Sequence, residues 1–252
     1  MTTSIQGQTD TTVLRLEPAA RPPVAAVLNT LGEDNEKLLE QRLASPAECM
    51  FVAGFAETGA EKRYLAPMPP GPETRRRRRM RNDDSGIDLL CGAGMSFTPE
   101  QETHMFLRLN YCRYRVYSLL KDVGARRLSA DETRDLLKWE NATQLTREEI
   151  VRANVPLVLA MAKRTRITGV DHAEMISEGN MALMRAVEKF DCHRGYKFST
   201  YSCRAILKSF SRVATRTSRY RGYFPTEFDP TMEKSDYVGK KRRGVEGDCI
   251  DE

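Results

Sequence analysis

The fold is decided by the stretch from Asp171 to Phe190, which reads DHAEMISEGNMALMRAVEKF. When it is plotted as a helix at about 100° per residue, one side collects apolar side chains: Ile176, Leu183, Val187 and Phe190. The opposite side carries polar and charged residues together with two methionines: Glu174, Ser177, Glu178, Met181, Met184 and Arg185. Methionine is a common adaptable contact at protein interfaces. This side is therefore either a partner-binding face or an ordinary surface that carries methionines.

The next helix is predicted to begin at Ser199 and to end near Tyr220, and one side of it is basic. Cations recur there at every fourth residue, at Arg204, Lys208, Arg212 and Arg216, with Tyr201 and Arg219 beside them. Its apolar side consists of Cys203, Ile206, Leu207, Phe210, Val213 and Ala214. Residues 194–223 contain eight basic residues and no acidic one. Like charges four residues apart destabilise an isolated helix, so this pattern favours a polyanionic partner over a solvated face.

Aromatic residues flank the basic stripe, at Tyr196 and Phe198 before it and at Tyr220, Tyr223 and Phe224 after it. Cations follow a phosphate backbone and aromatic rings stack on exposed bases. The combination indicates a nucleic-acid-binding surface, with a merely solvated charged face as the alternative.

Helix signals also fill the stretch before these two helices. Thr98, Pro99 and Gln101 form a helix start, and that helix is predicted to reach about Asp122. Further starts are predicted at Ser129 with Glu132, at Thr146, and at Asp171 with Glu174. Pro156 lies inside the helix that is predicted to begin at Thr146, and we expect a kink or a break there. No stretch is a convincing strand, so the ordered part is predicted to be an all-α helical bundle.

The two ends of the chain lack such periodicity. Residues 1–95 are punctuated by proline and glycine and are predicted to be mostly disordered, apart from short helical stretches within 24–43 and an apolar patch at 50–55. An Arg-rich linker lies at 75–81 and is either a solvated charge run or an arm that contacts nucleic acid. Residues 225–252 form a short polar tail. An apolar share of 40% fits a chain that is only partly folded.

Several classes of protein are disfavoured. The longest apolar run, Val155 to Ala162, is far shorter than the ~20 residues of a membrane helix. The six cysteines are scattered and the three histidines offer no zinc spacing, so we expect free thiols, no metal and no cofactor. No nucleophile has a paired base and no glycine loop cradles phosphate, so we do not expect an enzyme.

Three stretches closely resemble region 2 of the bacterial RNA polymerase sigma factors of the sigma-70 family. They are IVRANVPLV at 150–158, ISEGNMALMRAVEKFD at 176–191 and RGYKFSTY at 194–201. Residues 96–121 are similar to the preceding region 1.2 of that family. The resemblance implies region 1.2-like helices over 96–145 and a region 2-like helical domain over 146–224. It also implies a cytoplasmic protein.

In that family one region 2 helix docks on the coiled-coil clamp helices of the largest polymerase subunit. The resemblance assigns this role to Glu174, Ser177, Glu178, Asn180 and Met184, and Met181 shares their face. The following loop and helix capture flipped bases of the single-stranded non-template strand at the promoter −10 element. The matching residues are Arg194, Tyr196, Lys197, Ser199 and Tyr201. Lys208, Ser211 and Arg212 match the upstream edge of that element, and Asn154 and Leu157 match a second base pocket; Arg204 and Arg216 join this set through the basic stripe.

Two departures from the family pattern leave two functions open. Arg204-Ala205 stands where housekeeping members carry a Trp-Trp pair that props open the duplex, and alanine offers no wedge. Only 29 residues follow Tyr223, too few for the downstream helical domains, so we expect no region 3 or 4. The chain is either a transcription initiation protein that binds core RNA polymerase and melts a −10-like element, or a degenerate sigma that occupies the polymerase clamp without opening DNA. An anti-sigma factor is a further candidate partner.

Overall fold

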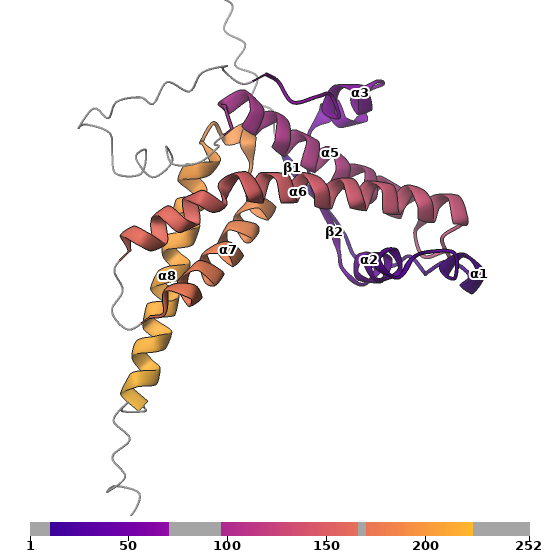
Figure 1. Ribbon diagram of the computed structural model, residues 1–252. Coiled ribbons are helices and arrows are strands. Elements are labelled where there is room, and N and C mark those ends of the chain that lie inside the picture. Colours follow the sequence, from indigo (N-terminus) through magenta and orange to yellow (C-terminus); the bar gives the residue numbers. More distant parts are fainter. Residues whose placement is uncertain (1–10, 71–96, 166–169, 224–252) are drawn as a thin grey trace, which may run out of the picture.

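The structure is a computed structural model that describes residues 11–70, 97–165 and 170–223, with only the backbone of 221–223. The Arg-rich linker at 75–81, the polar tail at 225–252, and the side chains of Tyr223 and Phe224 lie outside the described residues. Four long helices dominate: α5 (Pro99–Val123), α6 (Ala130–Arg164), α7 (His172–Lys189) and α8 (Phe198–Tyr223). In Figure 1, α6 runs across the molecule, with the N-terminal elements along one half and α7 and α8 against the other. The prediction of an all-α helical bundle is confirmed for the part of the chain that forms α5, α6, α7 and α8.

Two predicted helix starts are confirmed in atomic detail. The Thr98 hydroxyl accepts from the backbone N–H of Gln101, and the Gln101 side chain accepts from the Thr98 N–H, with Pro99 as the first helical residue of α5. Ser129 and Glu132 make the same reciprocal pair at the start of α6. Each pair satisfies donors that a helix start leaves free.

At two other predicted helix starts the structure differs from the prediction. The helix start at Thr146 is wrong, because α6 continues through this residue and its buried hydroxyl donates to the Ala142 carbonyl, four residues earlier. The predicted domain division at 145/146 thus falls inside one helix, which also continues past Pro156 without a break. Asp171 occupies the N-cap of α7, yet its side chain makes no capping hydrogen bond.

The N-terminal segment contains more structure than the sequence predicts. Strand β1 (Thr12–Leu16) pairs antiparallel with β2 (Ala47–Phe51), and between and after them come α1 (Ala25–Leu28), α2 (Glu33–Ala44), a 3₁₀ turn (Ala53–Ala56) and α3 (Ala60–Tyr64). The expectation of no strand is therefore wrong at β1 and β2, and the expectation of disorder is wrong for the rest of residues 12–65 apart from 24–43, where helical stretches are predicted and where α1 and most of α2 lie. An isolated pair of strands is marginal in water. Here it gains its support from α5 and α6, through a cluster in which Leu39, Phe55, Tyr111 and Trp139 are all buried.

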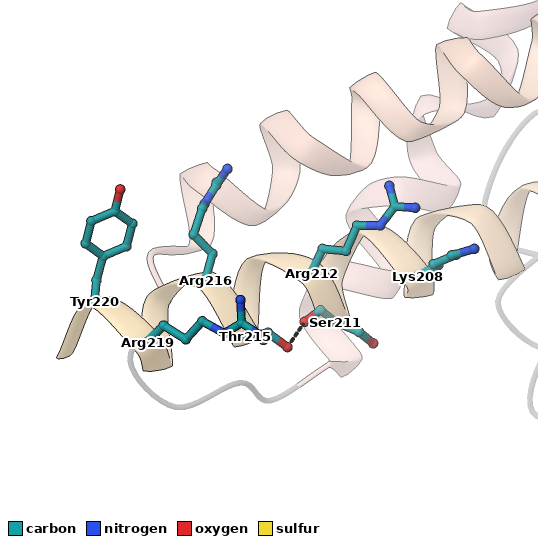
Figure 2. Close-up of a pocket in the computed structure, with 7 residues that line it drawn as sticks. All are labelled: Lys208, Ser211, Arg212, Thr215, Arg216, Arg219 and Tyr220. Atoms are coloured by element: carbon teal, nitrogen blue, oxygen red, sulfur yellow. Dashed lines mark hydrogen bonds between the residues drawn. The ribbon is translucent and has the colours of Figure 1, made fainter. Parts of the chain in front are cut away.

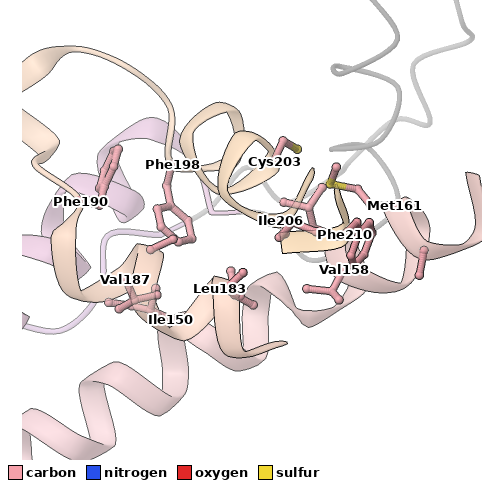
Figure 3. Packing of buried hydrophobic residues seen from close by; sticks show 14 of the residues in the cluster. Ile150, Val158, Met161, Leu183, Val187, Phe190, Phe198, Cys203, Ile206 and Phe210 are labelled. Carbon is pink, nitrogen blue, oxygen red and sulfur yellow. The ribbon is translucent and has the colours of Figure 1, made fainter. Parts of the chain in front are cut away.

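A second apolar cluster lies between α5, α6, α7 and α8 (Figure 3). Its centre holds three phenylalanine rings, Phe106, Phe190 and Phe198, whose centroids lie 4.7–5.2 Å apart. Leu183, Val158, Ile206 and Phe210 complete it with at most 1% of their surface exposed. Val158 belongs to α6, Leu183 to α7, and Ile206 and Phe210 to α8, and Figure 3 shows these side chains close to one another. This cluster fixes the positions of α7 and α8 relative to each other.

Three residues of the predicted apolar sides differ in burial: Leu207, Ile176 and Ala214, the last of which is half-buried. Leu207 is 43% exposed, because α8 buries the positions Cys203, Ile206, Phe210 and Val213 and leaves Leu207 at the edge of that face. Ile176 is only partly buried, because Met175 and Gly179 occupy the inner side of that turn of α7.

Within the described ranges, no helix is long and apolar enough to cross a membrane. The same ranges contain no group of three or more metal-ligating side chains that could hold an ion. Cys49, Cys112 and Cys192 are free thiols. Burial raises the pKa of Cys49 and Cys192 to about 12 and that of Cys112 to about 11, so these thiols stay protonated near neutral pH.

Candidate nucleic-acid and partner interface

The basic side of α8 is an exposed surface, which we call the α8 stripe, formed by Lys208, Ser211, Arg212, Thr215, Arg216, Arg219 and Tyr220 (Figure 2). All seven residues come from one helix, whose opposite side is anchored in the core by Ile206, Phe210 and Val213. The hydroxyls of Ser211 and Thr215 donate to backbone carbonyls four residues earlier, at 3.0 and 2.9 Å. The stripe is therefore a row of exposed cations on a helix that is anchored in the core.

The loop before α8 projects one aromatic ring outward and buries the next. A 3₁₀ turn (Cys192–Arg194) ends at Gly195, whose φ of 73° favours glycine. Tyr196 follows with 71% of its surface exposed, whereas Phe198 is 1% exposed and lies in the core. The backbone N–H of Phe198 donates to Glu102 of α5 at 2.7 Å, which holds the loop against the bundle.

Other predicted DNA-binding residues surround Tyr196. Arg194, Lys197 and Arg204 are exposed, Ser199 is half-buried, and Tyr201 is 38% exposed with its ring 5.6 Å from Phe190. Arg194 also lies 3.6 Å from the carboxylate of Asp191. Two tyrosine rings and several cations thus lie next to one another at the start of α8.

The predicted partner face of α7 divides in two. Ser177, Met181, Met184 and Arg185 are exposed, the methionines by 43% and 37%. Glu174 and Glu178 instead lie toward α8, where Arg216 donates to both carboxylates at 2.7 and 3.4 Å. The hydrogen bond to Glu174 is the main reason that the pKa of Arg216 is raised. The structure therefore joins two residues of the predicted polymerase face to one of the predicted DNA face.

Three predicted site residues are not freely available. Leu157 is 6% exposed and belongs to the core cluster. Asn154 is half-buried and its amide donates to the Ile150 carbonyl at 2.8 Å. The Asn180 side-chain oxygen is buried and accepts no hydrogen bond from the described chain.

Sequence reasoning missed two supporting residues. Ser209 is buried beneath α7 and donates to the Glu178 carbonyl at 3.3 Å. Its place on the inner side of α8, beside Phe210, is the only signal that the sequence offers. Glu102 lies 96 residues from Phe198, and no local pattern indicates that contact.

The bundle, its basic helix and the aromatic loop before it define a protein that presents a cationic surface beside an acidic and methionine-containing one. Residues 150–220 match the family model for sigma-70 region 2. The chain is 33% identical over 177 residues to the RNA polymerase principal sigma factor HrdC of Streptomyces coelicolor, and the match covers 67% of this chain. The chain belongs to the sigma-70 family. It spans about half the length of that relative, 52%.

Proposed function

We propose that this protein acts in transcription initiation, by binding core RNA polymerase and a single-stranded −10-like promoter segment. The observation that carries the proposal is the surface from Tyr196 to Arg219, where exposed aromatic rings and cations share one rigid helix and its leading loop. A polyanion with unpaired bases fits that surface better than a duplex or a protein does, because only unpaired bases can stack on the rings.

The DNA contacts divide by chemistry. Tyr196 and Tyr201 stack on flipped bases, and Lys197 and Arg194 neutralise the nearby phosphates. Lys208, Ser211 and Arg212 continue the phosphate path along α8. Ser199 lies between the two sets, at the start of the helix.

Polymerase docking uses the other exposed surface, on α7. Ser177, Met181 and Met184 form its adaptable centre, and Glu174 and Glu178 supply negative charge at its edge toward α8. Such a surface fits the clamp helices if these present cations and apolar side chains. The proposal assigns no catalytic step to this chain, because RNA synthesis belongs to the polymerase, and it places the protein in the cytoplasm with that enzyme.

A second function, clamp occupancy without promoter opening, is favoured by one observation. Ala205 is half-buried and packs against the core, so it presents no ring to the duplex, and Arg204 beside it is exposed. Planar stacking by an arginine replaces only part of what a tryptophan wedge contributes.

In vitro transcription with the matching core polymerase tests the proposal. We expect RNA from a −10-like template only when the protein is added. Met181→Lys should reduce polymerase pull-down at least tenfold, because it adds a cation at the centre of a face that receives cations. Met68→Lys is the matched control, since Met68 is also exposed, by 38%, and lies in the segment before residue 71. Polymerase binding without any RNA would support the second function, and no binding would refute both.

A further inference from the structure

We propose that Arg216 is an internal competitor for the carboxylates of the polymerase-docking face, so that docking on α7 releases a cation to the DNA-binding surface of α8. This inference rests on the proposed function, since it takes its two surfaces from there. Arg216 then couples polymerase docking on α7 to DNA binding on α8, in addition to being a phosphate contact.

The geometry at Arg216 is that of one cation shared by two acids. Its terminal nitrogen lies 2.7 Å from Glu174 and 3.4 Å from Glu178, across the contact between α8 and α7. In the described chain no other cation lies within 4 Å of either carboxylate. The three side chains remain 31–51% exposed, so an incoming partner can reach them.

Arg216 differs in this from its neighbours on the stripe. Lys208 and Arg212 are exposed and form no ion pair with any residue between 11 and 70, 97 and 165, or 170 and 220. Within the described part of the chain their charges are therefore unpaired, whereas that of Arg216 is already paired.

Two consequences follow from the shared pairing. A cation of the polymerase that approaches Glu174 or Glu178 has to displace Arg216, which weakens docking. Phosphate that draws Arg216 away leaves both carboxylates unpaired, so the potential at the docking face becomes more negative and docking of a basic partner is strengthened. Such coupling is reciprocal by thermodynamic necessity, and an exposed ion pair changes an equilibrium by a factor of about two to five.

A double-mutant cycle on the isolated protein tests the competition without polymerase. Its readout is the affinity for single-stranded thymidine homopolymer at low salt, for wild type, Arg216→Gln, the Glu174→Gln/Glu178→Gln variant and the triple variant. We expect Arg216→Gln to weaken binding less than about twofold in the wild-type background, and about fivefold once both carboxylates are neutral. An equal effect in both backgrounds would overturn the proposal.

Affinity for core polymerase supplies the second readout. Arg216→Gln should tighten binding by about two- to fivefold. Arg152→Gln should leave binding unchanged, because Arg152 is an exposed cation of α6 that forms no ion pair within the described ranges. Equal tightening by both variants would mean that net charge alone acts, which refutes the competition. If wild type binds no polymerase, the proposed function fails. The double-mutant cycle with DNA still decides whether Glu174 and Glu178 keep Arg216 from phosphate.

Discussion

Gly179 shows how closely a single residue can control the positions of α7 and α8. A Cβ atom there would lie 2.6 Å from a methyl carbon of Val158 and 3.1 Å from the ring of Phe210. Both neighbours are at most 1% exposed, so neither can move into solvent. We expect Gly179→Ala to reduce the free energy of unfolding by about 1–3 kcal/mol, as overpacking of a filled core does. Urea denaturation measures this.

Ser177→Ala is the control for that substitution, since Ser177 lies two residues away on the exposed side of α7. It should change the free energy of unfolding by less than about 0.5 kcal/mol. A Gly179→Ala variant as stable as wild type would show that α7 can shift away from α8 without cost.

Tyr196 permits a clean test of base stacking, because the side chain is 71% exposed. Tyr196→Ala should weaken binding of a −10-like single strand by about 1–3 kcal/mol, the contribution of one stacked base. The slope of log K against log salt should stay unchanged, since no charge is lost. Titrations by fluorescence anisotropy at several salt concentrations measure both quantities.

Arg212→Gln is the matched comparison in the same titrations, because it removes a charge and no aromatic ring. Removing one phosphate contact should reduce the salt slope by about 0.7 for a single strand. If both variants change the slope alike, the aromatic and cationic contributions are not separate, and the stacking assignment of Tyr196 is wrong.

Glu132 introduces a pH dependence at the start of α6. Hydrogen bonds from Arg126, and then from the Ser129 backbone, lower the pKa of its carboxyl from 4.5 to about 2. A lowered folded-state pKa contributes stability that is complete above pH 4.5 and is lost as the pH falls toward 2. Wild type should therefore exceed Glu132→Gln in melting temperature near pH 6 and approach it near about pH 3. A constant difference between the two pH values would contradict this.

Among the elements, the pair of strands β1 and β2, the following 3₁₀ turn and α3 depend on the helices against which they pack. Phe55 is 3% exposed and its ring lies 5.6 Å from Tyr111, which in turn lies 5.9 Å from Trp139. Phe55→Ala should lower the free energy of unfolding by about 3–5 kcal/mol. It should also shift the emission of Trp139, the only tryptophan of the chain, to longer wavelength as water enters.

Val13→Ala is the control for that experiment, because Val13 lies on β1 with 63% of its surface exposed. Its emission spectrum and denaturation midpoint should match those of wild type. An unshifted spectrum for Phe55→Ala would mean that Trp139 is shielded by α5 and α6 alone.

The elements also show which features a sequence can reveal. The starts of α5 and α6 are predictable because a capping box is a local signal, complete within four residues from Thr98 or Ser129. The strand pair is not, because β1 and β2 are five residues each and their partners on α5 are far away in the sequence, 60 residues in the contact of Met50 with Asn110. The helix start predicted at Thr146 was wrong for a related reason. Threonine occurs both as an N-cap and inside a helix, where its hydroxyl donates to the carbonyl four residues earlier.

In the candidate site, too, local features could be predicted from the sequence and long-range contacts could not. The exposure of the α8 cations could be predicted from helical periodicity, whereas Tyr196 lies in the loop before α8 and is indicated by its place beside the basic stripe. The pairing of Arg216 with Glu174 and Glu178 could not, because it depends on how α7 and α8 cross, which Gly179 and the buried rings around it decide.

At the scale of the whole molecule, α6 connects the two apolar clusters. Its first half packs on the N-terminal elements through Leu136 and Trp139, and its second half on α7 and α8 through Val158 and Met161. Arg113 of α5 and Arg147 of α6 both pair with Glu188 of α7, at 2.6 and 3.4 Å. The proposed docking and DNA surfaces are therefore held on one continuous framework.

Opening the first base pair costs unpairing and unstacking, a few kcal/mol. An aromatic wedge offsets part of this by stacking where the flipped base had been. At the corresponding place this chain presents the exposed Arg204 and the half-buried Ala205, whose side chain faces the core. A working initiator of this kind should therefore depend on DNA that opens easily, and Arg204 is the position at which a wedge can be added without disturbing the core.

RNA yield on linear, supercoiled and pre-melted bubble templates decides this, with wild type and Arg204→Trp compared in each case. We expect wild type to transcribe bubble and supercoiled templates at least about tenfold better than linear ones, since ~1.4 kcal/mol of opening cost corresponds to that factor. Arg204→Trp should raise the yield from linear DNA and leave the bubble template unchanged, because there the melting step is already complete. Equal wild-type yields on linear and bubble DNA would refute the missing-wedge argument. Inactivity on every template, with polymerase still bound, would identify a protein that occupies the clamp without opening promoters.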